Sequence, residues 1–502
     1  MKNYEIDATW HYHNGTKHPN GMLLNRFHVF HPSHRPTPYK IYKNISHVSL
    51  SLDKNPIGIS TLDAISTICS TQSNTVLDSG TIGRVLYFSS GITKKIKFPE
   101  PLGEVDFRAA SCTGALYHIE IYLVCSDMPG LDAGVYHFDP KQMKLDTIRL
   151  GDFRKFVTDS TADEQFAIKS SAILIFTDVF SRNSIKYQSR EYRHAFWDCG
   201  TILANTLAIT SAHKIPSKII TGFVDSQICQ LLGLDINEEA PIVILPLGVT
   251  HDEAKAYPPL QEINLEAVAS EYQIEYPEIT AMHESSCLDT KQDVSSWRQQ
   301  ITREYVEPAK LIPLKTIQSE EPLENTIIRR GSTRKFSLES ITLEELSTIL
   351  NKSTSGIDSD FVNQGFISDI YMIVNAVDGL EPGSYYFVKE KNSLEQLRKG
   401  SFRNASGNLG LDQDLPYDAS VTIFLMVNLD KILKHFGNRG YRVAQLDSAI
   451  TGGKMYLASY AMSLGATGLT FYDDIVTNFF SPHAENKEAM FLIAIGKKEK
   501  PT

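Results

Sequence analysis

The stretch Gly134-Val-Tyr136-His-Phe138 returns as Gly383-Ser-Tyr385-Tyr-Phe387, so the two copies lie 249 positions apart. The same spacing, or one residue less in the last case, relates three further pairs: Gly151-Asp-Phe153-Arg154 with Gly400-Ser-Phe402-Arg403, Tyr192-Arg193 with Tyr441-Arg442, and Phe223-Val-Asp225 with Phe471-Tyr-Asp473. A run of identities at one spacing indicates an internal duplication. Two copies this large are typical of a homodimer joined in one chain, with a pseudo-two-fold axis between the halves.

The duplication divides the 502 residues, a length that favours about two to four domains. We expect an N-terminal extension over residues 1–57 and a first domain over 58–249. A linker that crosses between the halves follows over 250–325, because this part interrupts the repeat and is rich in Glu, Pro and Gln. The second domain is expected over 326–502.

Composition excludes several classes of protein. The net charge is −10, which makes nucleic acid an unfavourable partner. No apolar run approaches the ~20 residues of a membrane span, and the first residues lack the apolar core of a signal peptide. The six cysteines are scattered without a C-x-x-C pair, which argues against a zinc site and a disulfide scaffold. We therefore expect a cytoplasmic protein without a membrane or nucleic-acid partner.

Hydrophobic patterning predicts the same elements in each half. Ile119–Cys125 and Ser368–Val374 alternate like strands, and Val421–Val427 is apolar enough for a buried strand. Trp197–Ala208 and Ala449–Tyr460 combine apolar with small residues, as expected of closely packed central helices. Strands and helices without a glycine-rich nucleotide loop favour an α+β fold over a Rossmann fold.

The halves differ first in a basic segment of the second half, Arg329-Arg330-Gly331-Ser332-Thr333-Arg334-Lys335. The aligned first-half segment, residues 69–74, has no basic residue. Arginine forks match phosphate oxygens in pairs, and hydroxyls add neutral donors, so the segment could bind a phosphate. Lys497 in the C-terminal tail adds a positive charge that the first half lacks. A solvated basic turn is the alternative interpretation.

Two further segments have candidate functional groups in the first half that the second half lacks. The loop Ser111-Cys112-Thr113-Gly114 has small residues that allow a flat ligand to approach the backbone, whereas residues 360–363 of the second half are larger. Lys186-Tyr187 corresponds to His435-Phe436, and a Lys beside a Tyr hydroxyl could form a proton-transfer pair, each residue lowering the pKa of the other. A plain turn and a surface pair are the alternatives.

The groups that the two halves lack are complementary. The second half has the phosphate segment, and the first half has the loop and the proton-transfer pair. In a dimer whose ligand lies across the interface, each site takes parts from both subunits. A fused pseudo-dimer can therefore lose one site and keep one composite site.

At these residues the chain resembles the nitroreductase-like FMN flavoproteins, and within them the SagB/ThcOx-type dehydrogenases known as azoline oxidases. The basic segment resembles the family's phosphate motif, and Arg108 to Tyr117 resembles its Pro-Ser-Ala-Gly-Ala-Leu-Tyr-Pro loop, with His118 replacing the final proline. Lys186-Tyr187 is similar to the catalytic pair of azoline oxidases. The resemblance implies two tandem nitroreductase-like domains that form an intramolecular pseudo-dimer.

The resemblance also implies residue roles toward one FMN per chain. The expected cofactor-binding residues are Arg329, Arg330, Ser332, Arg334 and Lys497 near the phosphate and ribityl chain, Ser111, Cys112, Thr113 and Gly114 against the flavin ring, and Leu469 and Thr470 near its N5 atom. Lys186 and Tyr187 are the expected catalytic residues.

The favoured function is the FMN-dependent dehydrogenation of an azoline-type heterocycle in a peptide, with oxygen reoxidising the flavin. An NAD(P)H-dependent nitro or quinone reductase is one alternative. A non-catalytic scaffold of a peptide-modifying complex is another. The expected partners are a small-molecule or peptide substrate and a peptide-modifying enzyme.

Overall fold

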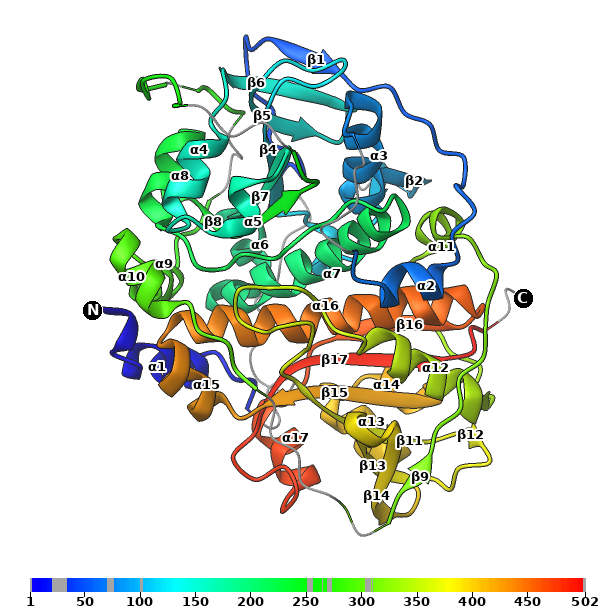
Figure 1. Ribbon diagram of the computed structural model, residues 1–502. Coiled ribbons are helices and arrows are strands. Elements are labelled where there is room, and N and C mark those ends of the chain that lie inside the picture. Colours follow the sequence, from blue (N-terminus) through cyan, green and yellow to red (C-terminus); the bar gives the residue numbers. More distant parts are fainter. Residues whose placement is uncertain are drawn as a thin grey trace.

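A computed structural model describes residues 2–19, 34–69, 76–99, 103–250, 256–263, 265–268, 273–302, 308 and 310–499. Two antiparallel sheets lie on either side of a central pair of long helices (Figure 1). The first sheet has the strand order β1 (His47–Ser49), β6 (Lys144–Leu150), β5 (Gly134–Asp139), β4 (Ile119–Cys125), β7 (Ala172–Val179) and β8 (Glu239–Leu247). The second has the order β16 (Gly465–Leu469), β17 (Glu488–Gly496), β15 (Val421–Val427), β11 (Asp369–Val374), β13 (Gly383–Val388), β14 (Ser393–Lys399) and β9 (Ile312–Pro313).

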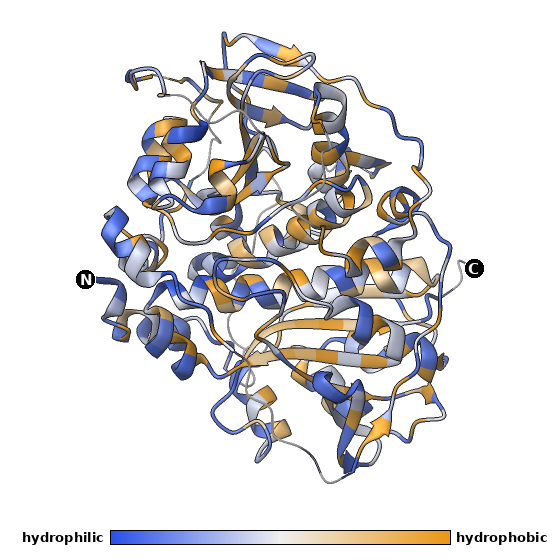
Figure 2. Cartoon of the chain, in the orientation of Figure 1, coloured by the Kyte–Doolittle hydropathy of each residue, from blue (hydrophilic) through white to orange (hydrophobic). Residues whose placement is uncertain are grey.

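The predicted α+β fold with two similar halves is confirmed. Counterparts β5 and β13 begin 249 residues apart, as do β8 and β17. Strands β15 and β17 are largely hydrophobic (Figure 2), since this sheet is covered on both sides. Of the helices that the structure describes, none combines the length and the hydrophobicity that crossing a bilayer requires.

The long helices α7 (Glu191–Ala212) and α16 (Arg439–Ala461) pack closely on each other, and small residues at their crossing allow this approach. A Cβ atom on Gly200 would lie 2.5 Å from the Cβ of Ala449. One on Gly453 would lie 2.6 Å from the Cβ of Ala204. Real Cβ atoms do not come this close, so each half contributes one glycine to the contact.

Reciprocal ion pairs join the halves around the same axis. Asp473, at the start of α17 (Asp473–Phe480), accepts bonds from Arg193 at 2.6 Å and Arg190 at 3.1 Å. Its counterpart Asp225, at the start of α8 (Asp225–Leu232), accepts from Arg439 at 2.7 Å and Arg442 at 2.8 Å. All six side chains are buried. When residue i of one half contacts j of the other and j contacts i, the interface has the two-fold character of an isologous dimer.

Candidate functional site

The small-residue loop of the first half is held by α7. The Asp198 carboxylate accepts hydrogen bonds from the Thr113 backbone N–H and hydroxyl, each at 2.8 Å, and from the Cys112 thiol at 3.0 Å. The Thr201 hydroxyl donates to the Ser111 carbonyl at 2.8 Å. Two positions of one helix therefore fix the loop from Ser111 to Thr113.

Gly114 then brings this loop against the predicted catalytic pair. Lys186 and Tyr187 end helix α6 (Phe180–Tyr187), which precedes α7. Gly114 has a φ of +63°, and a Cβ atom there would lie 2.9 Å from the Tyr187 hydroxyl and 3.4 Å from Lys186 Nζ. Glycine is required for both reasons, because a side chain is strained at this φ and would displace the pair.

The electrostatics of the pair differ from the expectation that each residue lowers the pKa of the other. Burial raises the pKa of Tyr187, and the charge of Asp198 raises it further, so its phenol stays protonated at neutral pH. Burial lowers the pKa of Lys186, with contributions from the cations Arg35 and Arg334. The expectation was wrong for Tyr187, because a desolvated phenol disfavours its anion.

The basic segment of the second half begins at the end of α11 (Leu323–Arg329) and reaches the first half. Arg330 donates from Nε to the Ala109 carbonyl at 2.9 Å, while its Nη1 is shielded from solvent and has no hydrogen-bond partner among the described residues. Arg334 is exposed, and its charge acts on Lys186 and Tyr187. The predicted residues of the two halves thus come together.

Arg329 lies at the edge of this arrangement. It donates to the Tyr460 carbonyl at 2.6 Å and pairs with Glu321 at 3.3 Å. Most of the aligned first-half segment, residues 70–74, falls outside the described residues.

Ser332 and Gly468, which precedes Leu469 and Thr470, are linked through Tyr456 on α16. The Ser332 and Tyr456 hydroxyls are 3.3 Å apart, and the Gly468 N–H donates to the Tyr456 hydroxyl. Thr470 follows β16 directly, and its buried hydroxyl has no partner in the part of the chain that the structure describes. The segment 468–470 therefore lies beside the basic segment.

Lys497 lies away from these groups. Its ammonium pairs with Glu339 at 3.7 Å, whereas the ammonium of Lys498 lies 4.6 Å from the centre of the Tyr460 ring and close enough to Arg329 for their charges to interact. Successive residues of an extended segment point to opposite sides, so Lys498 rather than Lys497 lies beside Arg329 of the basic segment.

Sequence reasoning missed three residues that shape the site: Asp198, Tyr456 and Arg35. The guanidinium of Arg35 donates to the Ala115 carbonyl at 2.9 Å. The sequence does mark Asp198, because the repeat spacing aligns it with an identical residue, Asp447. The Asp447 carboxylate accepts hydrogen bonds from the backbone N–H groups of Ile367 and Ser368. Tyr456 and Arg35 gave no signal of this kind.

The pseudo-equivalent second location is filled by the protein itself. Asp360, the counterpart of Ser111, accepts hydrogen bonds from the backbone N–H groups of Thr221 at 3.0 Å and Gly222 at 2.7 Å, which are the counterparts of Leu469 and Thr470. The indole of Trp297 packs between Gly222 and Phe436, its ring centre 5.3 Å from that of Phe436. Phe436 is the counterpart of Tyr187, so a carboxylate and a flat ring occupy the second location.

Comparisons with known proteins agree with this geometry. The model of the nitroreductase family matches residues 132–249 and 327–497, one region in each half. A solved structure of a candidate nitroreductase from Anabaena variabilis has the same fold along 98% of this chain and 99% of its own, with a TM-score of 0.80 and 23% identity. The tandem arrangement therefore exists in another solved protein.

Two curated relatives match about one third of the chain each. A candidate nitroreductase from Methanocaldococcus jannaschii is 24% identical over 187 residues, which are 35% of this chain and 91% of the relative. The microcin B17-processing protein McbC from Escherichia coli is 25% identical over 171 residues, which are 33% of this chain and 59% of McbC.

Proposed function

The chain belongs to the nitroreductase family, and we propose that it is an FMN-dependent oxidoreductase with one composite site between its halves. The proposal rests on one observation, that groups from both halves lie together. Arg330 and Arg334 of the second half lie close to the 111–114 loop and to the Lys186–Tyr187 pair of the first half. Neither half contains all of these groups.

The donor set fits an anionic, hydroxyl-rich cofactor. Arg330 Nη1 and the Thr470 hydroxyl are both buried without partners among the described residues, and leaving buried polar atoms unpaired is costly. Arg329, Lys498 and Ser332 add two positive charges and one hydroxyl. These residues would hold the phosphate and ribityl chain, and the loop from Ser111 to Gly114 would lie against the flavin ring.

FMN held by these residues would supply a hydride acceptor, with dioxygen as the final electron acceptor. Two residues of the chain would act on the substrate's proton and on the charge that its loss creates. Lys186 is placed to accept the proton, and burial and the cations Arg35 and Arg334 favour its neutral form by lowering its pKa. Tyr187 holds its proton at the phenol oxygen and can donate a hydrogen bond to a substrate heteroatom that gains negative charge.

We favour an azoline-type heterocycle in a peptide as the substrate, which loses one hydride and one proton to become an azole. The likeness to a microcin B17-processing protein supports this class, and a peptide-modifying enzyme as partner. The likeness to a candidate nitroreductase supports the alternative, reduction of nitro compounds or quinones by NAD(P)H.

The deciding experiment mixes the purified flavoprotein anaerobically with an azoline-containing peptide or with NADPH. Bleaching of the flavin by the peptide, with loss of two hydrogens from the peptide, is the expected result. Rapid bleaching by NADPH alone indicates the reductase instead. A colourless protein that cannot be loaded with flavin indicates a scaffold.

We expect one FMN per chain. The carboxylate of Asp360 and the ring of Trp297 occupy the pseudo-equivalent location, so only the composite site described above can accept a flavin. Release of flavin by denaturation, measured against polypeptide concentration, checks the ratio. Two equivalents per chain would contradict the asymmetry of the halves.

Replacement of Arg330 by alanine is expected to weaken FMN binding by about 10- to 100-fold, because a hydrogen bond to a charged group contributes roughly 1.5–3 kcal/mol. Titration of the apoprotein with FMN, followed by fluorescence quenching, measures the change. Arg334→Ala should weaken binding in the same direction without breaking contacts to the first-half backbone. Lys335→Ala is the matched control, since Lys335 points outward to Glu499 and should leave affinity unchanged.

A further inference from the structure

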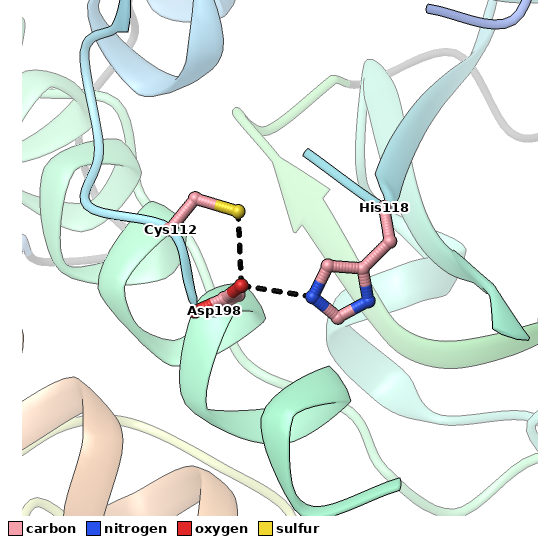
Figure 3. A group of neighbouring side chains, drawn as sticks. All are labelled: Cys112, His118 and Asp198. Carbon is pink, nitrogen blue, oxygen red and sulfur yellow. Dashed lines mark hydrogen bonds and ion pairs between the residues drawn. The ribbon is translucent and has the colours of Figure 1, made fainter. Parts of the chain in front are cut away.

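A buried polar cluster lies beneath the loop of the first half. We name it the His118 cluster, and its members are Cys112, His118, Asp178, Glu191 and Asp198. His118 donates from Nε2 to Asp198 at 2.8 Å, and its Nδ1 lies 2.6 Å from Asp178 and 3.3 Å from Glu191. Figure 3 shows the Asp198 carboxylate between the His118 ring and the Cys112 sulfur. The imidazole and the carboxyl groups of Asp178 and Glu191 are fully buried, and burial and the charge of Asp178 raise the pKa of Glu191 well above its usual range.

The cluster belongs to one half only. At the repeat spacing of 249, the second half keeps one member as Asp447 and replaces the other four with Phe361, Ile367, Val427 and Gly440. Asp447 holds its own loop by accepting hydrogen bonds from the backbone N–H groups of Ile367 and Ser368. The same fold thus forms with apolar residues, and burying several charges is costly even when they are paired. The cluster is therefore not needed for the fold itself, and it is kept in the half that carries Lys186 and Tyr187.

The distances indicate hydrogen bonds rather than metal ligation. Tetrahedral ligands at zinc bond lengths of about 2.0–2.1 Å lie about 3.3 Å apart. The 2.6 Å between His118 Nδ1 and Asp178 is shorter and suits a charge-assisted hydrogen bond. Burial alone would lower the pKa of His118, but Asp178, Asp198 and Glu191 outweigh it and raise this pKa well above 6.5, so the ring is an imidazolium.

We infer that His118 is a positioning residue for Tyr187. Its imidazolium contacts Asp178 and Glu191 through Nδ1 and Asp198 through Nε2, and Asp198 holds Thr113 by its backbone and its hydroxyl. Thr113 precedes Gly114, which lies against the Tyr187 hydroxyl. This ionic support fixes how closely the loop approaches the phenol.

The inference rests on the proposed function, and a double-mutant cycle tests it on the flavin-loaded protein. His118→Gln is expected to lower turnover by about 10- to 100-fold, since a misplacement of about 1 Å can cost 10²-fold. Flavin content should stay at the parent level. In a Tyr187→Phe background the same change should have little further effect. Independent losses that multiply would show a merely structural role and overturn the inference.

A second measurement does not depend on activity. In apoprotein carrying ¹³C-labelled tyrosine, the Tyr187 signal is identified by its absence in Tyr187→Phe. We expect His118→Gln to shift this signal, and an unmoved signal would overturn the inference. A triple variant, His118→Ile with Asp178→Val and Glu191→Gly, gives the first half the residues of the second and should shift the signal likewise if the single variant does not fold. Absence of turnover in the parent protein would count against the proposed function, whereas the tyrosine signal decides the inference separately.

Discussion

Replacement of Tyr187 by phenylalanine is expected to slow turnover by about 10²- to 10³-fold, the effect of removing one hydrogen-bond donor directed at developing negative charge. The phenol stays protonated because burial and the charge of Asp198 raise its pKa. Flavin content should not change, since the residues expected to hold the phosphate come from the second half. The rate of flavin bleaching by an azoline peptide, divided by bound flavin, measures the effect.

Tyr417→Phe is the matched control, because Tyr417 is 39% exposed on the second half and should leave the rate unchanged. Lys186→Met complements the test. If the neutral amine is the base, the parent rate rises with pH up to the lowered pKa of Lys186, and this rise disappears in the variant. A fully active Tyr187→Phe protein would refute the role of the phenol.

Replacement of Asp473 by asparagine is expected to destabilise the fold by about 3–5 kcal/mol, because it leaves the buried Arg190 and Arg193 without their shared carboxylate. The reciprocal Asp225→Asn should cost a similar amount, since Arg439 and Arg442 then lose theirs. Urea unfolding followed by circular dichroism measures both losses. Asp474→Asn is the control, because its carboxylate is 70% exposed beside Lys17 and such pairs contribute at most about 1 kcal/mol.

The pH dependence of stability follows from the same pairs. Burial opposes ionisation of Asp225, but Arg439 and Arg442 outweigh it and lower its pKa to about 2. The pKa of Asp473 is lowered in the same way by Arg190 and Arg193. A carboxyl whose pKa is lower in the folded state stabilises the fold above its ordinary pKa of about 3.9 and loses that contribution as the pH falls toward 2. We expect the acid unfolding midpoint to rise in either asparagine variant.

Much of the site could be predicted from the sequence, because each segment of one half can be compared with the aligned segment of the other. The loss of the loop residues in one half and of the basic segment in the other indicated a composite site before any contact was known. The reasoning failed where side-chain direction mattered. Lys497 and Lys498 are adjacent in sequence, yet only Lys498 lies beside Arg329, because an extended backbone turns alternate residues to opposite sides.

By itself, the sequence determined the duplication, the order of the strands and helices, and the segments that differ between the halves, because repeat spacing and hydrophobic periodicity are local properties. Tertiary structure alone decided which groups meet. Arg330 donates to the carbonyl of Ala109, more than 200 positions away. Asp360 accepts hydrogen bonds from the backbone N–H groups of Thr221 and Gly222, and His118 contacts three carboxyl groups. Contacts of this kind depend on how the two sheets and the central helices pack, and that packing brings together residues whose separation in the chain carries no information about their distance in space.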